Sequence, residues 1–233
     1  MGRRFLYKKI KDMDYKEKKF LKLLMKNISK NAIIVDVGGF RGKWTSYVRS
    51  IIECKNKEFY IFEANNQNFI SLKNTFNVDE NVKIINKGVG KANSTGTFFA
   101  LKGNDEIRPM SGFVKREIYD KYEYNTIDVE IVSLDEHGFN NKFLDFVKID
   151  VEGYEFDVLK GMKNILDKSM VKFIQFEYGG TYLDAGTKLN DLIEYLGNYG
   201  YKVYSFNGEK FTHLINFNDD YRYDNFIATK ENI

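Results

Sequence analysis

Four ionisable side chains that can do chemistry follow the ends of apolar runs in the second half of the sequence. They are Lys148, Asp150, Glu152 and Glu177. Lys148 and Asp150 lie two residues apart at the end of a run with the residue types of a buried strand, so their side chains share one face. Ligands bind at the carboxyl ends of the strands in open α/β sheets. The spacing therefore predicts a cluster of acids with one lysine at a ligand site.

Such a cluster has three uses that the sequence leaves open. In the first, Asp150 or Glu152 is a general base, Lys148 lowers the pKa of the neighbouring acid or stabilises negative charge that develops on the substrate, and Glu177 orients the substrate. In the second, Asp150, Glu152 and Glu177 hold Mg²⁺, which acidifies a bound substrate group directly. In the third, Lys148 and Asp150 form only a structural salt bridge that caps the next helix. We expect acid–base chemistry without a metal.

A second group of functional residues lies in the segment 31–45. Its β-branched run predicts a strand, and a helix is expected to begin near Trp44. The glycines between them are Gly38, Gly39 and Gly42. Glycines there allow a sharp turn close to a ligand, and the first N–H groups of the helix point at that ligand. The dinucleotide fingerprint G-x-G-x-x-G fails, because it needs a glycine at Val37.

Two acids indicate which cofactor this turn binds. Asp36 is the last polar residue of the first strand, and Glu63 follows the next apolar run, 59–62. An acid at the end of the second strand is placed to bind both ribose hydroxyls through charge-assisted hydrogen bonds. Together with the glycine turn, the two acids favour S-adenosylmethionine (SAM) over NAD. The alternative is an ordinary α/β turn with an unrelated acid.

The composition of the 233 residues limits the classes of function. Charged residues are 30% of the chain and the net charge is only +3, which is a weak footprint for nucleic acid. The single cysteine, Cys54, excludes an intramolecular disulfide and CxxC metal sites, and it fits a reducing compartment. No apolar run reaches the roughly 18 residues of a membrane span, and the N-terminus lacks the apolar stretch of a signal peptide. We therefore expect a cytoplasmic protein.

The order of the expected elements predicts an α/β fold. Strands are expected at 32–37, 58–63, 82–86, 95–101, 126–134, 143–150, 171–176, 201–206 and 225–229, and helices at about 44–54, 66–76, 154–166 and 187–198. The βαβαβ beginning implies a parallel sheet with right-handed crossovers and helices on both faces. The last two strands, joined without a helix, suggest an antiparallel closing pair. We interpret the segment between 101 and 126 as an insertion over the ligand edge; a surface loop is the alternative.

Several motifs together resemble the FkbM-type methyltransferases, a branch of the class I SAM-dependent methyltransferases. They are V-D-V-G-G-F-R-G-K-W-T at 35–45, I-F-E-A-N at 61–65, S-L-D at 133–135, V-K-I-D-V-E-G-Y-E at 147–155, L-K-G at 159–161, F-E at 176–177 and N-F-I-A at 225–228. The resemblance covers roughly residues 30–229. It implies a Rossmann-like, seven-stranded sheet whose last strand is antiparallel, in one domain at 31–233. The helical spacing of the apolar residues Leu21, Leu24, Met25 and Ile28 predicts an N-terminal helical extension at 1–30.

The resemblance also implies roles for individual residues. Asp36, Gly38, Gly42 and Thr45 would line the methionine side of SAM, Glu63 would hold the ribose, and the adenine would lie against Ala64 and the backbone near Gly88 and Val89. The family often has Ala-Asn where this chain has Gly39-Phe40, a departure that removes a side-chain amide near the cofactor but keeps the turn. No acid follows the third strand to bind the adenine amino group.

Members of this family typically O-methylate hydroxyls on glycans and other natural products. Methyl transfer from a sulfonium needs an aligned hydroxyl and removal of its proton, which the cluster of acids can provide. Ser111 in the insertion, with Tyr178 and Tyr182, which can stack on a sugar ring, are candidate acceptor contacts. We expect a small-molecule or glycan acceptor. The alternatives are a nucleic-acid methyltransferase, disfavoured because no Asn/Asp-Pro-Pro-aromatic loop follows Asp150, and a non-catalytic SAM-binding or scaffold protein.

Overall fold

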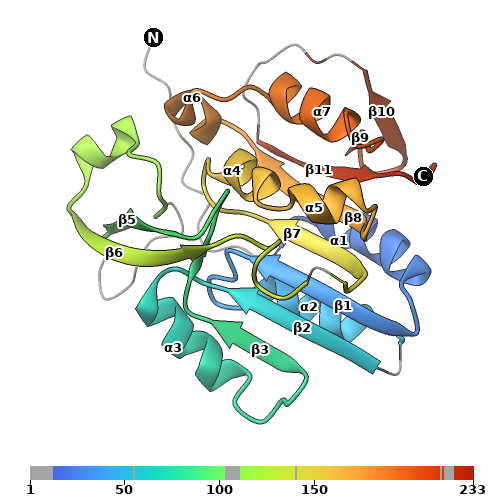
Figure 1. Cartoon of the computed structure of the whole chain (residues 1–233), viewed down its shortest axis with the longest axis horizontal. Coiled ribbons are helices and arrows are strands. Elements are labelled where there is room, and N and C mark those ends of the chain that lie inside the picture. The colour runs from blue at the N-terminus through green and yellow to red at the C-terminus, as the bar shows by residue number, and fades with distance from the viewer. Residues whose placement is uncertain (1–12, 55, 103–110, 140, 216, 218–222) are drawn as a thin grey trace.

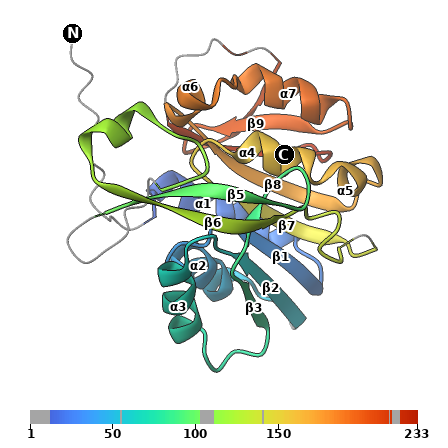
Figure 2. The ribbon, with the colours of Figure 1, turned by 60° about the vertical axis from the view of Figure 1, so that its left-hand side comes forward.

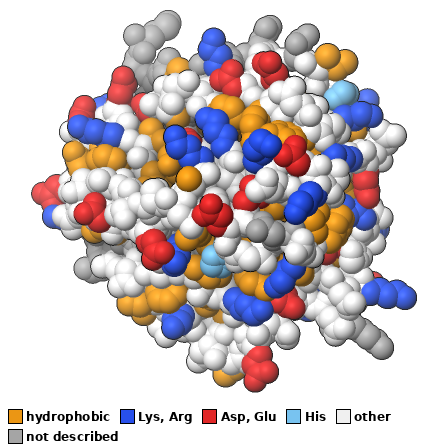
Figure 3. Space-filling model, viewed as in Figure 1, with side chains coloured by type: hydrophobic (Ala, Val, Ile, Leu, Met, Phe, Trp, Pro, Cys, Tyr) orange, Lys and Arg blue, Asp and Glu red, His pale blue; other side chains and the backbone are white. Residues whose placement is uncertain are grey.

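The computed structural model of the chain describes residues 13–54, 56–102, 111–139, 141–215, 217 and 223–233 (Figure 1). Residues 1–12 of the expected N-terminal extension and 103–110 of the expected insertion lie outside the described residues. None of the described helices is long and apolar enough to cross a membrane. Basic and acidic side chains are both spread over the face seen in Figure 3, in keeping with the small net charge.

The main sheet has eight strands in the order β10-β9-β11-β8-β7-β1-β2-β3. Their bounds are β1 (Asn31–Val37), β2 (Asn56–Phe62), β3 (Val82–Ile85), β7 (Leu144–Ile149), β8 (Val171–Tyr178), β9 (Lys202–Phe206), β10 (Phe211–Leu214) and β11 (Asp224–Thr229). The five strands from β8 to β3 pair in parallel, and β11 runs antiparallel to both β8 and β9. The predicted Rossmann-like, mostly parallel sheet with an antiparallel last strand is thus confirmed.

The predicted number of strands was wrong by one. The additional strand, β10, pairs antiparallel with β9 at the edge of the sheet. A turn joins the two strands, in which the backbone N–H and side-chain oxygen of Asn207 bond across to Lys210 and Glu209, and Gly208 has φ +102°. An Asn-Gly pair between apolar runs is a hairpin signal. The sequence therefore contained an indication of β10.

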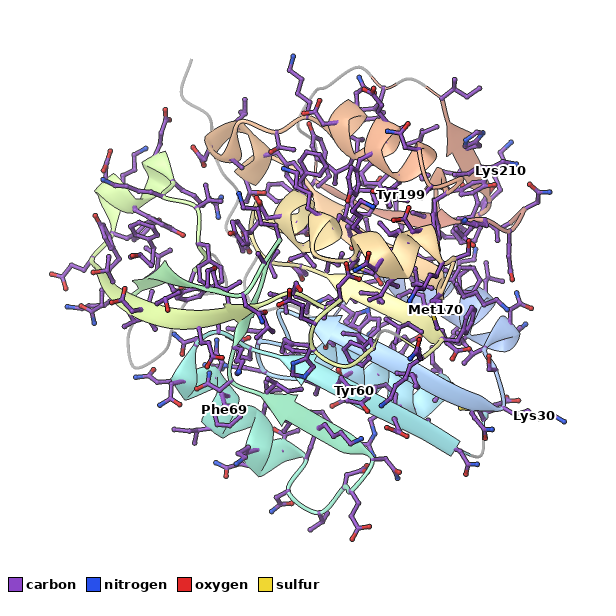
Figure 4. The ribbon with its side chains drawn as sticks, viewed as in Figure 1. Lys30, Tyr60, Phe69, Met170, Tyr199 and Lys210 are labelled. Carbon is purple, nitrogen blue, oxygen red and sulfur yellow. The ribbon has the colours of Figure 1, made fainter. Side chains whose placement is uncertain are left out.

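Helices cover both faces of the sheet, as predicted. They are α1 (Tyr15–Leu24), the 3₁₀ turn η1 (Met25–Asn27), α2 (Lys43–Ile51), α3 (Asn66–Thr75), α4 (Glu155–Lys160), α5 (Lys163–Asp167), α6 (Thr181–Ala185) and α7 (Leu189–Gly197). Alternate strand residues point to opposite faces, so Val35 packs in the core cluster that includes α4, α5 and α7, whereas Ile34 packs with α1 and α2. On the first face, Tyr199 packs edge-on against Tyr195, with centroids 5.2 Å apart (Figure 4).

The single helix expected at 154–166 is divided into α4 and α5. The carboxylate of Asp135 accepts the backbone N–H groups of Asn164 (2.8 Å) and Ile165 (3.0 Å), two orphan donors at the start of α5. A Cβ on Gly161, which ends α4, would lie 2.0 Å from the carbonyl oxygen of Gly90. The S-L-D motif therefore has a structural role, since its aspartate caps the second half of the interrupted helix.

A separate three-stranded sheet lies beside the carboxyl ends of the main strands (Figures 1 and 2). It consists of β4 (Gly88–Val89), β5 (Ser94–Leu101) and β6 (Tyr124–Val132), with β5 and β6 antiparallel. The described part of the insertion, residues 111–123, includes the 3₁₀ turn η2 (Glu117–Lys121), and Gly112 pairs with Phe99 of β5. This segment reaches the ligand edge of the main sheet, where Arg116 contacts Glu152.

Candidate active site

A pocket opens at the carboxyl ends of β1, β2 and β7. Among the residues predicted to bind a cofactor, its wall includes Gly38, Glu63, Ala64, Gly88 and Val89. Among those predicted for chemistry or the acceptor, it includes Ser111, Asp150 and Glu152. The wall also contains Phe98 and Phe113, which the sequence reasoning did not select. The chain thus brings residues from distant segments to one pocket.

Glu63 follows directly after β2 and is nearly buried, with 6% of its surface exposed. Its carboxylate accepts the backbone N–H groups of Phe40 (2.8 Å) and Asn65 (2.9 Å). Burial raises the pKa of Glu63 to about 7, although these hydrogen bonds act in the opposite direction. The Phe40 contact ties the glycine turn to the end of β2, so Glu63 is held in one orientation at the pocket wall.

Asp36 and Thr45 lie beneath the pocket rather than in its wall. Both are fully buried, and the Thr45 hydroxyl donates to the Asp36 carboxylate over 2.6 Å. The other Asp36 oxygen lies 3.3 Å from Nζ of Lys148. The hydroxyl and the ammonium let a carboxylate remain inside the protein. Asp36 is therefore not part of the pocket wall and supports the site through its contacts with Thr45 and Lys148.

The glycines of the turn make room mainly for other parts of the protein. A Cβ on Gly38 would lie 2.0 Å from the carbonyl oxygen of Asp150, and the residue has φ +83°. A Cβ on Gly39 would meet Ile61 at 2.1 Å, and Gly42 adopts the left-handed conformation as the N-cap of α2. Only Gly38 is also part of the pocket wall. The turn therefore packs closely against the backbone after β7 at Gly38 and against β2 at Gly39.

Lys148 is a buried cation between two carboxylates. Its Nζ lies 3.3 Å from Asp36 and 3.2 Å from Asp150. Burial alone would lower the pKa of Lys148, but the charges of Asp150 and Asp36 raise it above its usual value. The salt bridge considered from the sequence is thus present and engages one oxygen of Asp150, but it does not cap the next helix, because α4 begins after Tyr154 without a side-chain cap.

Asp150, Glu152 and Glu177 bring their carboxylates together. One oxygen from each lies within 4.8 Å of the other two, and no other such group of three His, Cys, Asp or Glu side chains occurs among the described residues. Burial raises the pKa of Glu152 to about 8, against the effect of Arg116, and burial with the charges of Asp150 and Glu152 raises that of Glu177. Oxygen ligands in this number suit Mg²⁺, Ca²⁺ or Mn²⁺.

Two residues that sequence reasoning missed hold Glu152 in place. Glu152 has φ +57°, a conformation that is strained for a residue with a side chain. The carboxylate of Glu155 accepts hydrogen bonds from the backbone N–H groups of the two residues that flank Glu152, Val151 and Gly153, both at 2.9 Å. Nη1 of Arg116 donates to Glu152 over 2.9 Å. Glu155 stood within the recognised motif, whereas nothing distinguished Arg116 from the other charges of the insertion.

Arg116 also connects the insertion to α6. Its Nε lies 3.5 Å from Asp184, and only 4% of its surface is exposed. A buried guanidinium needs such partners, because an uncompensated charge is costly inside a protein. The contacts of Arg116 with Glu152 and Asp184 therefore fix residues 111–116 against the acid cluster, which places this part of the insertion over the ligand edge.

The two tyrosines proposed for the acceptor lie inside the core. Tyr178 and Tyr182 are 0% exposed, their ring centroids are 4.4 Å apart, and the Tyr182 hydroxyl donates to the carbonyl oxygen of Glu177. Tyr178 shares a strand face with the buried Phe176, which explains its direction. Neither ring is free to stack on a sugar in this structure. Ser111 does line the pocket, and its hydroxyl accepts the N–H of Leu101 (3.0 Å).

Residues 36–203 match the family model of the methyltransferase FkbM domain. The chain belongs to the FkbM methyltransferase family. Membership places it among the SAM-dependent methyltransferases, and SAM is accordingly the cofactor for which the pocket must be assessed. No curated protein matches the sequence significantly.

Solved structures of low sequence identity share the fold of this FkbM chain. Methyltransferase FkbM from Methylobacillus flagellatus KT has a TM-score of 0.55 and 14% identity, over 87% of this chain and 44% of that one. A Streptococcus mutans protein in complex with S-adenosylhomocysteine (SAH) has 0.51 and 12%, over 93% and 98%. An rRNA methylase from Streptococcus thermophilus has 0.51 and 12%, over 94% and 98%. The chain thus spans less than half of the Methylobacillus protein.

Proposed function

We propose that this FkbM-family protein transfers the methyl group of SAM to a hydroxyl, on a sugar, a glycan or a related natural product. The observation that carries the proposal is the position of two carboxylates, those of Asp150 and Glu152, on the wall of the same pocket that carries Glu63. One pocket then holds both a group able to bind a ribose and groups able to take a proton from an acceptor.

The residues of the pocket fit SAM. The Glu63 carboxylate is at the wall and fixed by two backbone N–H groups, so that it can accept hydrogen bonds from the hydroxyls of a ribose. Ala64, Gly88 and Val89 give an apolar wall beyond it, and Gly38 lies on the side toward Asp150. SAM, when bound, supplies a methyl group on a positively charged sulfur, which makes that methyl electrophilic.

We assign the proton acceptor to Glu152 on geometry. Asp150 and Glu152 both lie on the pocket wall, and each has a cationic partner, Lys148 or Arg116. Glu152 is the one held at φ +57°, and strained backbone of this kind is concentrated at active sites. Its pKa of about 8 matches a general base that works near neutral pH. Asp150, paired with Lys148, and Glu177 then orient the acceptor hydroxyl. A positioned base of this kind contributes about 10²- to 10⁴-fold in rate.

A divalent cation is the alternative use of the same acids. Asp150, Glu152 and Glu177 present the oxygen ligands that such an ion needs. We propose the metal-free use, because Arg116 and Lys148 already supply positive charge to Glu152 and Asp150. Addition of EDTA, followed by Mg²⁺ or Mn²⁺, distinguishes the two uses. Loss of turnover with EDTA and its recovery with a metal would show that the three acids bind an ion and that Glu152 is not a general base.

The experiment that tests the proposed function follows the methyl group. The purified protein is incubated with SAM carrying a CD₃ group and with methyl glycosides, bacterial polysaccharide fractions or total RNA, and the products are analysed by mass spectrometry. We expect the label as an O-methyl group on a carbohydrate. We also expect Glu152→Gln to reduce turnover by about 100-fold or more with unchanged SAH affinity, whereas Glu194→Gln, an exposed acid on α7, has no effect. Label in RNA, or on nitrogen, would contradict the proposal.

A further inference from the structure

Phe113 stands out among the residues of the pocket wall that have no assigned role. Its ring lies over two glycines of the small sheet. A Cβ on Gly88 would come within 2.4 Å of the ring, and one on Gly96 within 3.3 Å. Any other residue at Gly88 would therefore displace the ring. Two glycines on different strands thus leave the space that this aromatic side chain occupies.

Aromatic neighbours and the backbone hold the ring in position. Phe98 contacts it edge-on with centroids 5.2 Å apart, and Tyr154 lies at 5.3 Å on another side. The preceding residue, Gly112, exchanges two backbone hydrogen bonds with Phe99 of β5 (2.9 and 3.2 Å). Arg116, three residues later, is bound to Glu152. Phe113 is consequently pre-organised as a wall of the pocket before any ligand enters.

The position of the ring along the pocket indicates which part of SAM it meets. Glu63 marks the ribose, and Gly38 with Asp150 marks the side of the reacting methyl. Asn86 fixes the end of β3 beside Glu63, since its amide donates to the carbonyl oxygens of Glu63 (2.9 Å) and Ala64 (3.3 Å). Gly88 and Val89 follow Asn86 in the chain and line the pocket, and the Phe113 ring lies against Gly88. This is the end that remains for the purine base.

The charges at this end distinguish stacking from hydrogen-bonded recognition of the base. Among the described residues of the wall, the carboxylates are those of Glu63, Asp150 and Glu152, which are assigned to the ribose and the acceptor side. None is left to accept the adenine amino group. An aromatic face, in contrast, binds any base through its π surface. The other polar side chains of the wall already have protein partners: Asn68 donates to Glu63, Ser111 accepts from Leu101, and Lys87 pairs with Glu130. We therefore expect the ring contact to be the main side-chain interaction of the base.

We infer that Phe113, supplied by the insertion, is the residue on which the adenine of SAM stacks, and that it sets the affinity for the base. This inference rests on SAM being the cofactor of the proposed function. It assigns to the insertion a role in cofactor binding in addition to its contact with the acid cluster through Arg116.

The test compares ligands with and without the base. Binding of SAH and of S-ribosylhomocysteine, which lacks the adenine, is measured by calorimetry for the wild type, Phe113→Ala, Phe113→Leu and Phe113→Tyr, the weak ligand by displacement of SAH. We expect Phe113→Ala to lower SAH affinity roughly 5- to 150-fold, the range for loss of a base-stacking aromatic. Phe113→Tyr should retain affinity, Phe113→Leu should lose part of it, and S-ribosylhomocysteine affinity should change less than about twofold.

Phe211→Leu is the matched control, because Phe211 is a partly buried aromatic that packs against Phe206 on the edge strand β10, outside the pocket wall. We expect it to leave SAH affinity unchanged. Unchanged SAH affinity in Phe113→Ala, or an equal loss for both ligands, would overturn the inference, the latter because it indicates general damage to the pocket. A wild type that does not bind SAH would instead overturn the proposed function.

Discussion

The buried position of Glu63 predicts how the affinity for SAH depends on pH. In the ligand-free protein burial raises the pKa of Glu63 to about 7. Ribose hydroxyls donate hydrogen bonds, and these favour the charged carboxylate, so bound cofactor lowers that pKa. Below pH 7 binding must therefore release the proton that Glu63 carries. Affinity for SAH should fall as the pH falls below 7 and should be nearly constant above it.

The size of this effect follows from the pKa. With a pKa of about 7 in the free protein and an ionised carboxylate in the complex, affinity falls about 25-fold between pH 7.5 and pH 5.5. Glu63→Gln removes the titrating group. It also weakens binding at pH 7.5 by about 3 kcal/mol, roughly 150-fold, because two hydrogen bonds to a charged group are replaced by weaker ones.

Calorimetric titration with SAH at several pH values, in buffers of different ionisation enthalpy, measures both the affinity and the proton released. Glu63→Gln, titrated in parallel, removes the contribution of ionisable groups on SAH itself from the comparison. A pH dependence that persists unchanged in Glu63→Gln would refute the reasoning, as would wild-type affinity in that variant. Thermal melting of the variant checks that it remains folded, since the carboxylate also binds Phe40 and Asn65.

Three further predictions concern residues that position the site, each measured as the free energy of unfolding in urea. Gly38→Ala should lose about 3 kcal/mol or more, because its Cβ would lie 2.0 Å from the Asp150 carbonyl oxygen at φ +83°; a loss below about 1 kcal/mol would contradict that contact. Arg116→Gln should lose about 3 kcal/mol by leaving Glu152 without its buried partner, and Arg116→Lys should restore part of it; equal stability of all three proteins would argue against the pair. Asp135→Ala should cost about 1 kcal/mol as a lost helix cap, and no change would exclude that role.

The features that the sequence predicted well are local in the chain. The strand, glycine turn and helix of 31–45 are encoded by consecutive residue types, and so is the acid after β2. The meeting of Asp150 with Glu177 at one edge was predictable as well, because parallel strands end on the same side of a sheet. For these residues, topology alone determines proximity.

The features that were not predicted depend on contacts across long stretches of sequence. Arg116 contacts Glu152 from 36 residues away in the sequence. The sequence did not distinguish it from the other charged residues of the insertion as a partner of Glu152. The reason for a glycine at position 38 was also not predicted. Only the folded structure shows that the Asp150 carbonyl oxygen lies where a Cβ of residue 38 would be. Tyr178 is different: it lies two residues from Phe176, so strand alternation already pointed it into the core.

The central claim is that the pocket beside Glu63 and Asp150 binds SAM. Calorimetric titration of the purified protein with SAM and with NAD⁺, each with and without EDTA, tests it most directly. The account predicts saturable binding of SAM that EDTA does not change, and no binding of NAD⁺. Binding of NAD⁺ in place of SAM, or no binding of SAM, would contradict it.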